Sequence, residues 1–178
     1  KTLNYTFTFA VLLALSFLSN QVLATDIYRS IGQAAVLDTD NAGADTVTVD
    51  AAAHTATFSA GANLPTNVGV GDVIRYGANL AFIHARISAT VYTVKSAAGG
   101  APTTSGGAST VWSVFRAYTS FANAEAGTEN AGIGVDFDTW TSTVGSPHDI
   151  DTANETWHFA VYADNVWSSA WTLQYWTT

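Results

Sequence analysis

The sequence predicts an all-β protein, a small antiparallel β-sandwich or barrel, and three observations lead to this fold class. Short segments rich in Val, Ile, Thr, Tyr and Phe recur about every ten residues along much of the chain. Several of these segments alternate with a period of two, which places one set of side chains on each face of a strand. Clusters of Gly, Asn, Asp and Ser separate them, as tight turns require. Nothing resembles the alternating strand and helix units of a parallel α/β fold.

Six segments are the predicted strands of this fold. They are Asp26–Ser30, Thr46–Val49, His54–Phe58, Val68–Tyr76, Leu80–Arg86 and Thr90–Lys95. Asp38–Asp45 and Gly77–Asn79 have the composition of turns. The uncharged stretch Ser96–Ser109 contains only small residues and Pro, which is typical of a long exposed loop or of a linker.

A short helix is predicted at Ser120–Ala126, where Thr119 or Ser120 can cap its start and Gly127 can end it. The composition changes in the same region. Residues 117–178 contain eight acidic residues, no Lys or Arg, and five of the six Trp residues. We therefore predict one domain at 25–118 and a second unit at 119–178.

The N-terminal residues 1–24 are predicted to be a secretory signal peptide. A charged Lys1 precedes the apolar run Phe9–Leu18, and Val22-Leu23-Ala24 places small residues before a cleavage point at Thr25. The run is shorter than the ~20 apolar residues of a membrane span. The alternative is an uncleaved membrane anchor or a pilin-like assembly helix. We expect a secreted protein, extracellular or at the cell surface, without a membrane segment once the signal is removed.

Composition excludes several classes of function. The 178 residues include 6 Lys and Arg against 14 Asp and Glu, a formal net charge of −8, which argues against a nucleic-acid partner. The chain contains no Cys, so disulfides, thiolate metal sites and cysteine nucleophiles are excluded. Neither a G-x-S-x-G nucleophile motif nor a P-loop occurs.

Six segments together resemble a known kind of protein. They are Val68–Tyr76, Ala81–Val94, Phe115–Ser120, Glu125–Asn130, Trp157–Asp164 and Trp171–Thr178. The pattern is similar to an N-terminal module of large secreted bacterial surface proteins, in which a small β-rich domain precedes a right-handed parallel β-helix of the pectate-lyase-like superfamily. The resemblance covers residues 27–178. It implies that a short helix and the first strands of a β-helix follow the sandwich or barrel, in the front part of a longer protein. It brings no catalytic residues.

A calcium site is one candidate in this sequence. Asp38, Asp40 and Asp45 lie in a turn-like stretch that contains Asn41 and Gly43, and Ca²⁺ prefers several oxygen ligands on a flexible turn. The EF-hand pattern fails, because Ala42 stands at its fifth position and no Glu stands at its twelfth. A plain turn is the favoured interpretation, and calcium remains the only cofactor that the sequence suggests.

Carbohydrate binding is a second candidate, since aromatic rings beside carboxylates suit the faces and hydroxyls of sugars. Trp167 and Trp171, in a Ser- and Ala-rich stretch, are the predicted sugar contacts, with a place in the core as the alternative. Trp157 and Phe159 are expected in the core, because they alternate onto one face of a strand. A solvated acidic surface is expected before ion binding, and ion binding before a glycosidase-type carboxylate pair, for the following residues: Asp136, Asp138, Asp149, Asp151 and Glu155.

Two functions follow from these observations. The favoured one is a non-enzymatic structural or adhesive extracellular module that caps a larger β-solenoid, with a polysaccharide, a cell-surface ligand or a second copy of itself as partner. The alternative is an accessory or substrate-binding part of a secreted polysaccharide lyase or glycoside hydrolase. The sequence leaves open whether the complete protein is an enzyme.

Overall fold

The computed structural model describes residues 23–40, 43–138, 148–165 and 176–177. Its strands are β1 (Thr25–Ile31), β2 (Val36–Thr39), β3 (Val47–Asp50), β4 (Thr55–Phe58), β5 (Val73–Tyr76), β6 (Asn79–Arg86), β7 (Val91–Lys95), β8 (Trp112–Phe115), β9 (His148–Asp149), β10 (Glu155–Val161) and β11 (Trp176–Thr177). The helices are α2 (Phe121–Ala126) and α3 (Ile150–Ala153). Strands therefore dominate, and the all-β prediction is confirmed.

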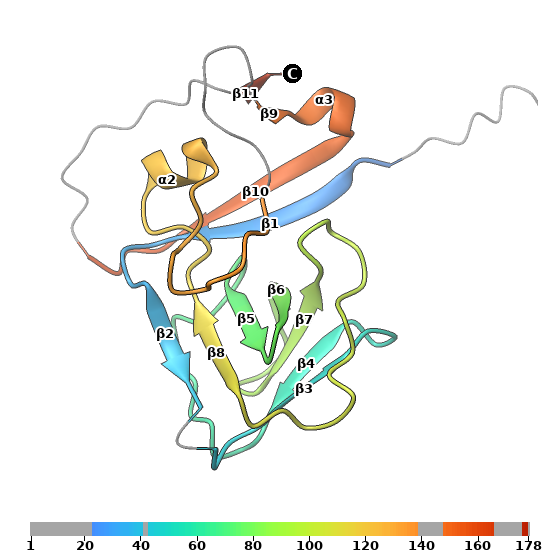
Figure 1. Cartoon of the computed structure of the whole chain (residues 1–178), viewed down its shortest axis with the longest axis vertical. Helices are drawn as coiled ribbons and strands as arrows, with labels where there is room; N and C mark the ends of the chain where they lie inside the picture. Colours follow the sequence, from blue (N-terminus) through green and yellow to red (C-terminus); the bar gives the residue numbers. More distant parts are fainter. Residues whose placement is uncertain (1–22, 41–42, 139–147, 166–175, 178) are drawn as a thin grey trace, which may run out of the picture.

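Seven strands form one antiparallel sheet in the order β2-β8-β5-β6-β7-β4-β3. The sheet bends round on itself, so that its first and last strands approach each other across the lower half of the molecule (Figure 1). We call it the curved sheet. The turn between β5 and β6 uses Gly77 at φ 58°, the left-handed region that glycine enters without steric penalty.

An apolar interior fills the concave side of the curved sheet. All seven strands contribute to it, because alternate residues of each strand point inward. The β3 and β4 burial patterns show this directly, with every second residue buried. Rings of Phe58, Tyr92 and Trp112 meet edge to face at 4.9–5.9 Å between centroids. Among the described residues, Trp112 Nε1 is the one buried polar side-chain atom that has no hydrogen-bond partner.

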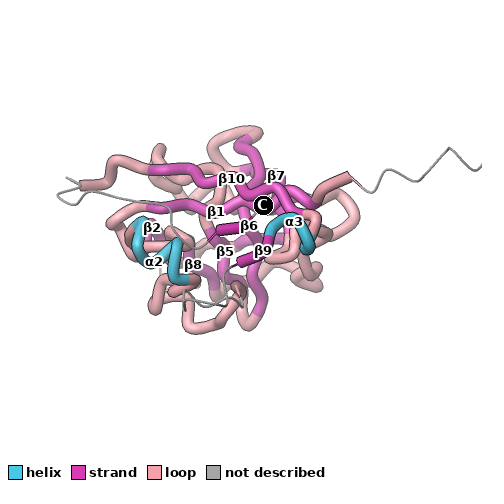
Figure 2. Tube along the Cα trace, turned by 90° about the horizontal axis from the view of Figure 1, so that it is seen from above, coloured by secondary structure: helices cyan, strands magenta, loops and turns pink. Residues whose placement is uncertain are grey.

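A second layer lies on the convex side of the curved sheet. There β1 and β10 form a parallel pair over seven residues, from Thr25 opposite Glu155 to Ile31 opposite Val161. The two strands run side by side across the sheet (Figure 2). We call this pair the parallel layer and its contact with the curved sheet the junction. A second apolar cluster fills the junction, with residues from β1, β5, β6, β8 and α2.

Two short helices and a second parallel pair complete the structure. Helix α2 begins after Ser120, whose side chain accepts a hydrogen bond from Asn123 N, and ends at Gly127 in the left-handed conformation. This confirms the predicted helix and its end. Strand β11 pairs in parallel with β9, Trp176 lying opposite His148. Both helices of the described chain are too short to cross a bilayer.

The structure corrects two local predictions. The predicted turn Asp38–Asp45 starts too early, because β2 continues through Thr39 and pairs with β8, a strand that the sequence pattern did not mark. The predicted strand Val68–Tyr76 starts too early, since only Val73–Tyr76 is extended. Before it the chain turns at Gly71, where φ is +82° and an added Cβ would lie 2.2 Å from the backbone of Arg29. Pairing with β8 explains the first difference, and the close approach of β1 explains the second.

Three further predictions concern the signal peptide, the β-helix and the division into two units. The signal peptide 1–24 lies almost entirely outside the described residues. A β-helix is not seen in the described part of the chain, where parallel pairing is limited to the β1–β10 and β9–β11 pairs and one isolated bridge. The division into 25–118 and 119–178 stays a prediction, and β10 of the second unit pairs with β1 of the first.

Candidate functional site

Arg29 is fully buried in the junction. It lies on β1 between two inward-facing isoleucines, so the alternation of the strand carries its guanidinium into the protein, where it is 1% exposed. Its Nε and Nη2 donate to the two carboxylate oxygens of Asp138 at 2.9 and 2.6 Å. Its other two hydrogen bonds go to the carbonyl oxygens of Tyr28 and Ala97, each at 2.9 Å. The buried charge is therefore neutralised and hydrogen-bonded, as burial of an ion requires.

Three aromatic rings surround the same guanidinium. Its central carbon lies 4.1 Å from the ring centre of Phe82, 5.1 Å from that of Phe137 and 5.2 Å from that of Trp157. The negative faces of aromatic rings attract a cation at these distances. Arg29 thus joins a ring of the curved sheet, a ring of the loop after α2 and a ring of β10.

Asp138 has further contacts besides Arg29. The Tyr118 hydroxyl donates to its carboxylate, and burial together with this neighbouring charge raises the pKa of Tyr118 well above its usual value. The Glu129 carboxylate accepts hydrogen bonds from the backbone N–H groups of Phe137 and Asp138 at 3.1 and 2.8 Å. The loop that carries Asp138 is therefore fixed by side-chain contacts instead of regular secondary structure.

Arg116, just after β8, is the second buried arginine of the junction. Its Nη1 donates to both oxygens of Asp72 at 2.7 and 2.8 Å, and its Nε and Nη2 donate to Asp164 at 2.8 Å each. The ring of Tyr162 lies 3.6 Å from its central carbon. Because Asp164 and Tyr162 follow β10, this group ties the exit of the parallel layer to the curved sheet.

The two carboxyls around Arg116 differ in protonation behaviour. Burial raises the pKa of Asp72 to about 6, against the opposing effect of Arg116, because Asp72 is fully buried. The hydrogen bond from Arg116 lowers the pKa of Asp164, which lies nearer the surface. Gly32 is required beside this group, since a Cβ there would lie 2.3 Å from an Asp164 oxygen.

A cavity of about 270 Å³ opens at the junction beside Arg29, and we call it the Trp157 pocket. Its walls are mostly apolar and also include two carboxylates and one imidazole. The lining residues are Ile27, Ala97, Ala98, Phe137, Asp138, His148, Glu155 and Trp157. Aromatic surface beside hydrogen-bonding groups in a concave site is the usual composition of a small-molecule site.

Glu155, the first residue of β10, has a fixed orientation in this pocket. The indole Nε1 of Trp157 donates to its Oε2 at 2.8 Å, and Nε2 of His148 lies 3.0 Å from the same oxygen. The His148 and Trp157 rings meet edge to face at 5.1 Å. Since both hydrogen bonds end on Oε2, Oε1 is oriented without being engaged by either residue.

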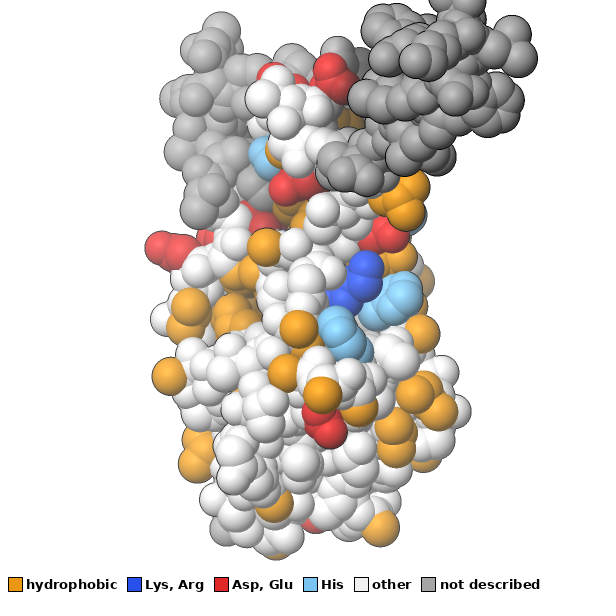
Figure 3. All heavy atoms as spheres, turned by 90° about the vertical axis from the view of Figure 1, so that its right-hand side faces the viewer, with side chains coloured by type: hydrophobic (Ala, Val, Ile, Leu, Met, Phe, Trp, Pro, Cys, Tyr) orange, Lys and Arg blue, Asp and Glu red, His pale blue; other side chains and the backbone are white. Residues whose placement is uncertain are grey.

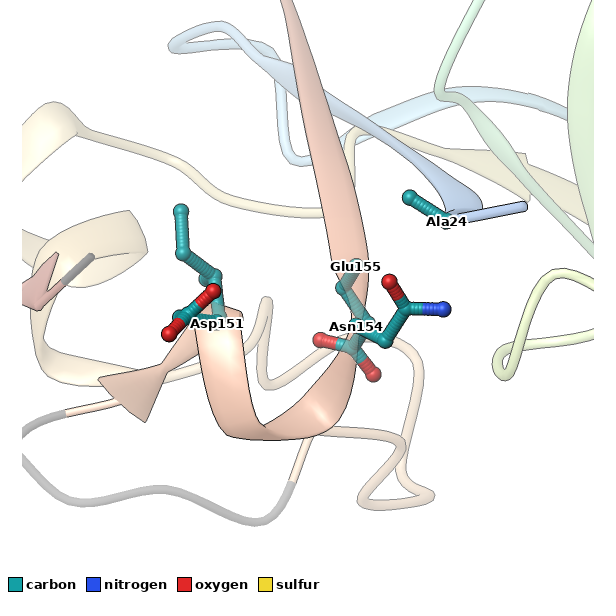
Figure 4. A pocket seen from close by; sticks show the side chains of 5 residues that line it. Ala24, Asp151, Asn154 and Glu155 are labelled. Carbon is teal, nitrogen blue, oxygen red and sulfur yellow. The ribbon is translucent and has the colours of Figure 1, made fainter. Parts of the chain in front are cut away.

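Glu155 also borders a second hollow, of about 290 Å³, between the start of β1 and α3. Figure 4 shows Asp151 on one side of β10, and Asn154 and Ala24 on the other. This hollow has acidic and amide groups but no aromatic wall, so it is the less suited of the two to an organic ligand.

A stack of polar rings lies on the surface where the parallel layer meets β6 and β7. Tyr28 lies 4.6 Å from both His84 and His158 between ring centroids, and Lys95 Nζ lies 5.2 Å from the Tyr28 ring centre. His158 Nε2 is 3.0 Å from an Asp26 oxygen. Partial burial, reinforced by Lys95, lowers the pKa of His84. Figure 3 shows histidine and basic side chains together on one face of the molecule.

The three predicted calcium ligands are not brought together as a site. Asp45 is buried and accepts a hydrogen bond from Ser59 Oγ at 3.2 Å, whereas Asp38 accepts one from the N–H of Thr39. Asp40 is a weak acceptor for the Thr39 hydroxyl at 3.4 Å. Within the described ranges, no three His, Cys, Asp or Glu side chains form a group that could hold a metal ion. Calcium binding stays a prediction.

The predicted sugar contacts Trp167 and Trp171 lie outside the described residues. Among the acidic residues considered for a catalytic pair, the structure brings Asp138 and Glu155 to one pocket. Asp149 instead caps α3 by accepting from Thr152 N, and Asp136 is exposed. Trp157, expected in the core, is half-buried and lines the pocket.

Sequence reasoning did not identify Arg29 and Arg116 as site residues, although a signal exists for both. Arg29 occupies an inward position between Ile27 and Ile31, and Arg116 interrupts an apolar run that ends at Tyr118. A charged residue at a core position predicts a buried ion pair. The partners of the two arginines lie 44 to 109 positions away, so the sequence pattern does not identify them.

The chain matches no protein-family model, no curated protein and no solved structure. The resemblance to the N-terminal module of secreted surface proteins therefore stays an expectation.

Proposed function

We propose that this chain is a non-enzymatic extracellular structural or adhesive module that caps a larger parallel β-solenoid. One observation carries the proposal: the chain returns to lie parallel to itself twice on the convex side of the curved sheet. Strand β10 lies parallel to β1, and β11 lies parallel to β9. The second return takes 28 residues, from His148 to Trp176, and passes through β10 on the way. A parallel return of about 28 residues, such as this second one, is typical of a solenoid coil.

The two edges of the parallel layer support the same role. Even-numbered positions of β10 and its flanks bond to β1, as the Tyr162 N–H does with the carbonyl of Ile31 at 2.8 Å. Because backbone groups alternate in direction along a strand, those of Val161 point away from β1. A further parallel strand can add along that edge. The other edge of β1 is already bonded to Gly71 and Tyr118, so growth proceeds from β10 only, and the first coil of the solenoid is capped.

The structure of the longer polypeptide encoded beyond Thr178 tests this proposal. We expect successive coils of about 28 residues, the first of which pairs in parallel with β10 and β11. A gene product that ends at Thr178 would contradict the proposal. So would following residues that fold without contact to β10.

A matched pair of variants tests the edge itself in that longer protein. Val161→Pro removes an N–H that points away from β1, and we expect faster hydrogen exchange in the following coil. Val161→Thr keeps the N–H and a β-branched side chain, and should leave exchange unchanged. Equal exchange in the two variants would show that nothing pairs with this edge.

The alternative function, an accessory or substrate-binding part of a polysaccharide lyase or glycoside hydrolase, is favoured by one different observation. The Trp157 pocket combines aromatic walls with carboxylates. Both oxygens of Asp138 bind Arg29, so this carboxylate positions the loop and is not available as a base. The pocket therefore supports ligand binding more than bond cleavage.

A further inference from the structure

We infer that the Trp157 pocket binds a single neutral sugar ring, a hexopyranose or its N-acetyl derivative. The inference does not depend on the proposed solenoid role, because it uses only the cavity at the junction. Three properties of the pocket lead to it: its size and walls, the oriented carboxylate of Glu155, and the neutralised charge of Arg29.

The size and walls of the pocket suit one ring. The volume of about 270 Å³ lies just under the 300–1,000 Å³ typical for drug-sized ligands, so there is room for a single sugar unit and not for a long glycan. Phe137 and Trp157 give aromatic wall, and Ile27, Ala97 and Ala98 give aliphatic wall. Sugar rings carry C–H groups on their faces, which such walls cover.

Glu155 provides the polar recognition. Trp157 Nε1 and His148 hold its Oε2, and this fixes the carboxylate before any ligand arrives. Oε1 is then oriented to accept a hydrogen bond from a sugar hydroxyl, and a carboxylate acceptor makes a stronger bond than a neutral one. Preorganisation of this kind reduces the entropy lost on binding.

The charge of the pocket selects against an anionic ligand. Arg29 lies behind the wall, and its donors bind Asp138 and two carbonyl oxygens. The guanidinium therefore does not serve an incoming anion, while Glu155 repels one. Uronic acids and phosphorylated sugars are excluded on these grounds.

The test is ligand-observed NMR on the purified chain with defined probes. Methyl glucoside, methyl galactoside and N-acetylglucosamine are the neutral probes, galacturonic acid is the anionic probe, and glucosamine is the cationic probe. We expect at least one neutral probe to bind with a Kd on the order of 1 mM, as for other ligands of this size. Galacturonic acid should bind at least tenfold more weakly.

Two variants with matched controls locate the site. Ala98→Trp fills the cavity from its exposed rim and should weaken binding at least tenfold, whereas Ala52→Trp, in the exposed turn after β3, should not change it. Glu155→Gln should weaken binding about tenfold or more, and Asp136→Asn, which removes an exposed charge outside the pocket, should not. If Glu155→Gln does not fold, Ala98→Trp decides the question.

Three results would overturn the inference. One is the absence of binding by every neutral probe at 50-fold above the expected Kd, roughly 50 mM. Another is binding of galacturonic acid or glucosamine that equals or exceeds that of the neutral probes. The third is neutral-sugar binding that Ala98→Trp leaves intact, which would place the sugar elsewhere on the molecule.

Discussion

The interior of the curved sheet and the junction on its convex side are both buried, but different forces hold them together. In the interior, all seven strands contribute apolar side chains, and aromatic edges fill the space. In the junction, a smaller apolar cluster surrounds two fully buried arginines and their carboxylates. The interior needs hydrophobic side chains of suitable volume, whereas the junction needs particular partners.

Because of this difference, the junction depends on particular residues more than the interior does. Removing an ion from water is unfavourable, so a buried arginine stabilises the junction only when its carboxylates are in place. One partner of Arg116 is Asp164, which follows β10. The chain must therefore return to the curved sheet after β10 for this ion pair to form. The buried charges therefore determine how the parallel layer sits on the sheet.

The largest expected effect is at Arg116. Arg116→Ala leaves Asp72 and Asp164 together without a cation, and we expect the free energy of unfolding to fall by about 3–5 kcal/mol in urea denaturation. Arg75→Ala is the control, since Arg75 on β5 is only partly buried and hydrogen-bonds to backbone carbonyls. We expect about 1 kcal/mol there. Equal losses in the two variants would show that the buried ion pairs of Arg116 contribute no more than the backbone hydrogen bonds of a partly buried arginine.

A smaller effect is expected from pH. Because the pKa of Asp72 is raised to about 6 in the folded chain, its contribution to stability is fully present below its ordinary value of 3.8 and is lost as pH rises to about 6. Asp164 has a lowered pKa, so its contribution is present above pH 3.8 and is lost at lower pH.

Asp72→Asn isolates the first of these contributions. The variant should lack the decrease in unfolding free energy between pH 4 and 6, which amounts to at most about 3 kcal/mol. Urea midpoints measured from pH 4 to 7 for both proteins check this. Parallel pH profiles would show that Asp72 does not titrate in this range.

The smallest effect sharpens the comparison by removing one methyl group from each region. Ile83 lies in the interior and Ile31 in the junction, and both are at most 1% exposed. Ile→Val at either position should cost about 1 kcal/mol, because apolar contacts obey the same physics in both places. Thermal unfolding of the two variants measures it. A clearly larger loss at Ile31 would mean that apolar packing also distinguishes the junction.

Local features of the fold were predictable from the sequence. Alternation marked the strands around Ile27, Val47 and Val94, and a Ser cap with a terminal Gly marked α2. Strand β2 was missed because its partner β8 lies more than 70 residues away, and pairing over that distance leaves no local signal. Strand β8 was missed because all four of its residues are buried, which hides the period of two.

The candidate site was predictable only in part. The sequence marked the C-terminal third as rich in acidic residues and Trp, and Trp157, Asp138 and Glu155 of the pocket come from it. The assignment of sugar contacts to Trp167 and Trp171 stays a prediction. Composition identifies which residue types are available, but it does not say which of them face one cavity.

By itself, the sequence determined the β class, the main turns and the short helix, because side-chain periodicity and backbone preference act over a few residues. Only the tertiary structure decided that β1 pairs with β10, 130 positions further along the chain, and that Arg29 and Arg116 meet their carboxylates there. The free energy of a buried charge depends on what lies within a few ångströms of it, and that neighbourhood exists only after the chain has folded.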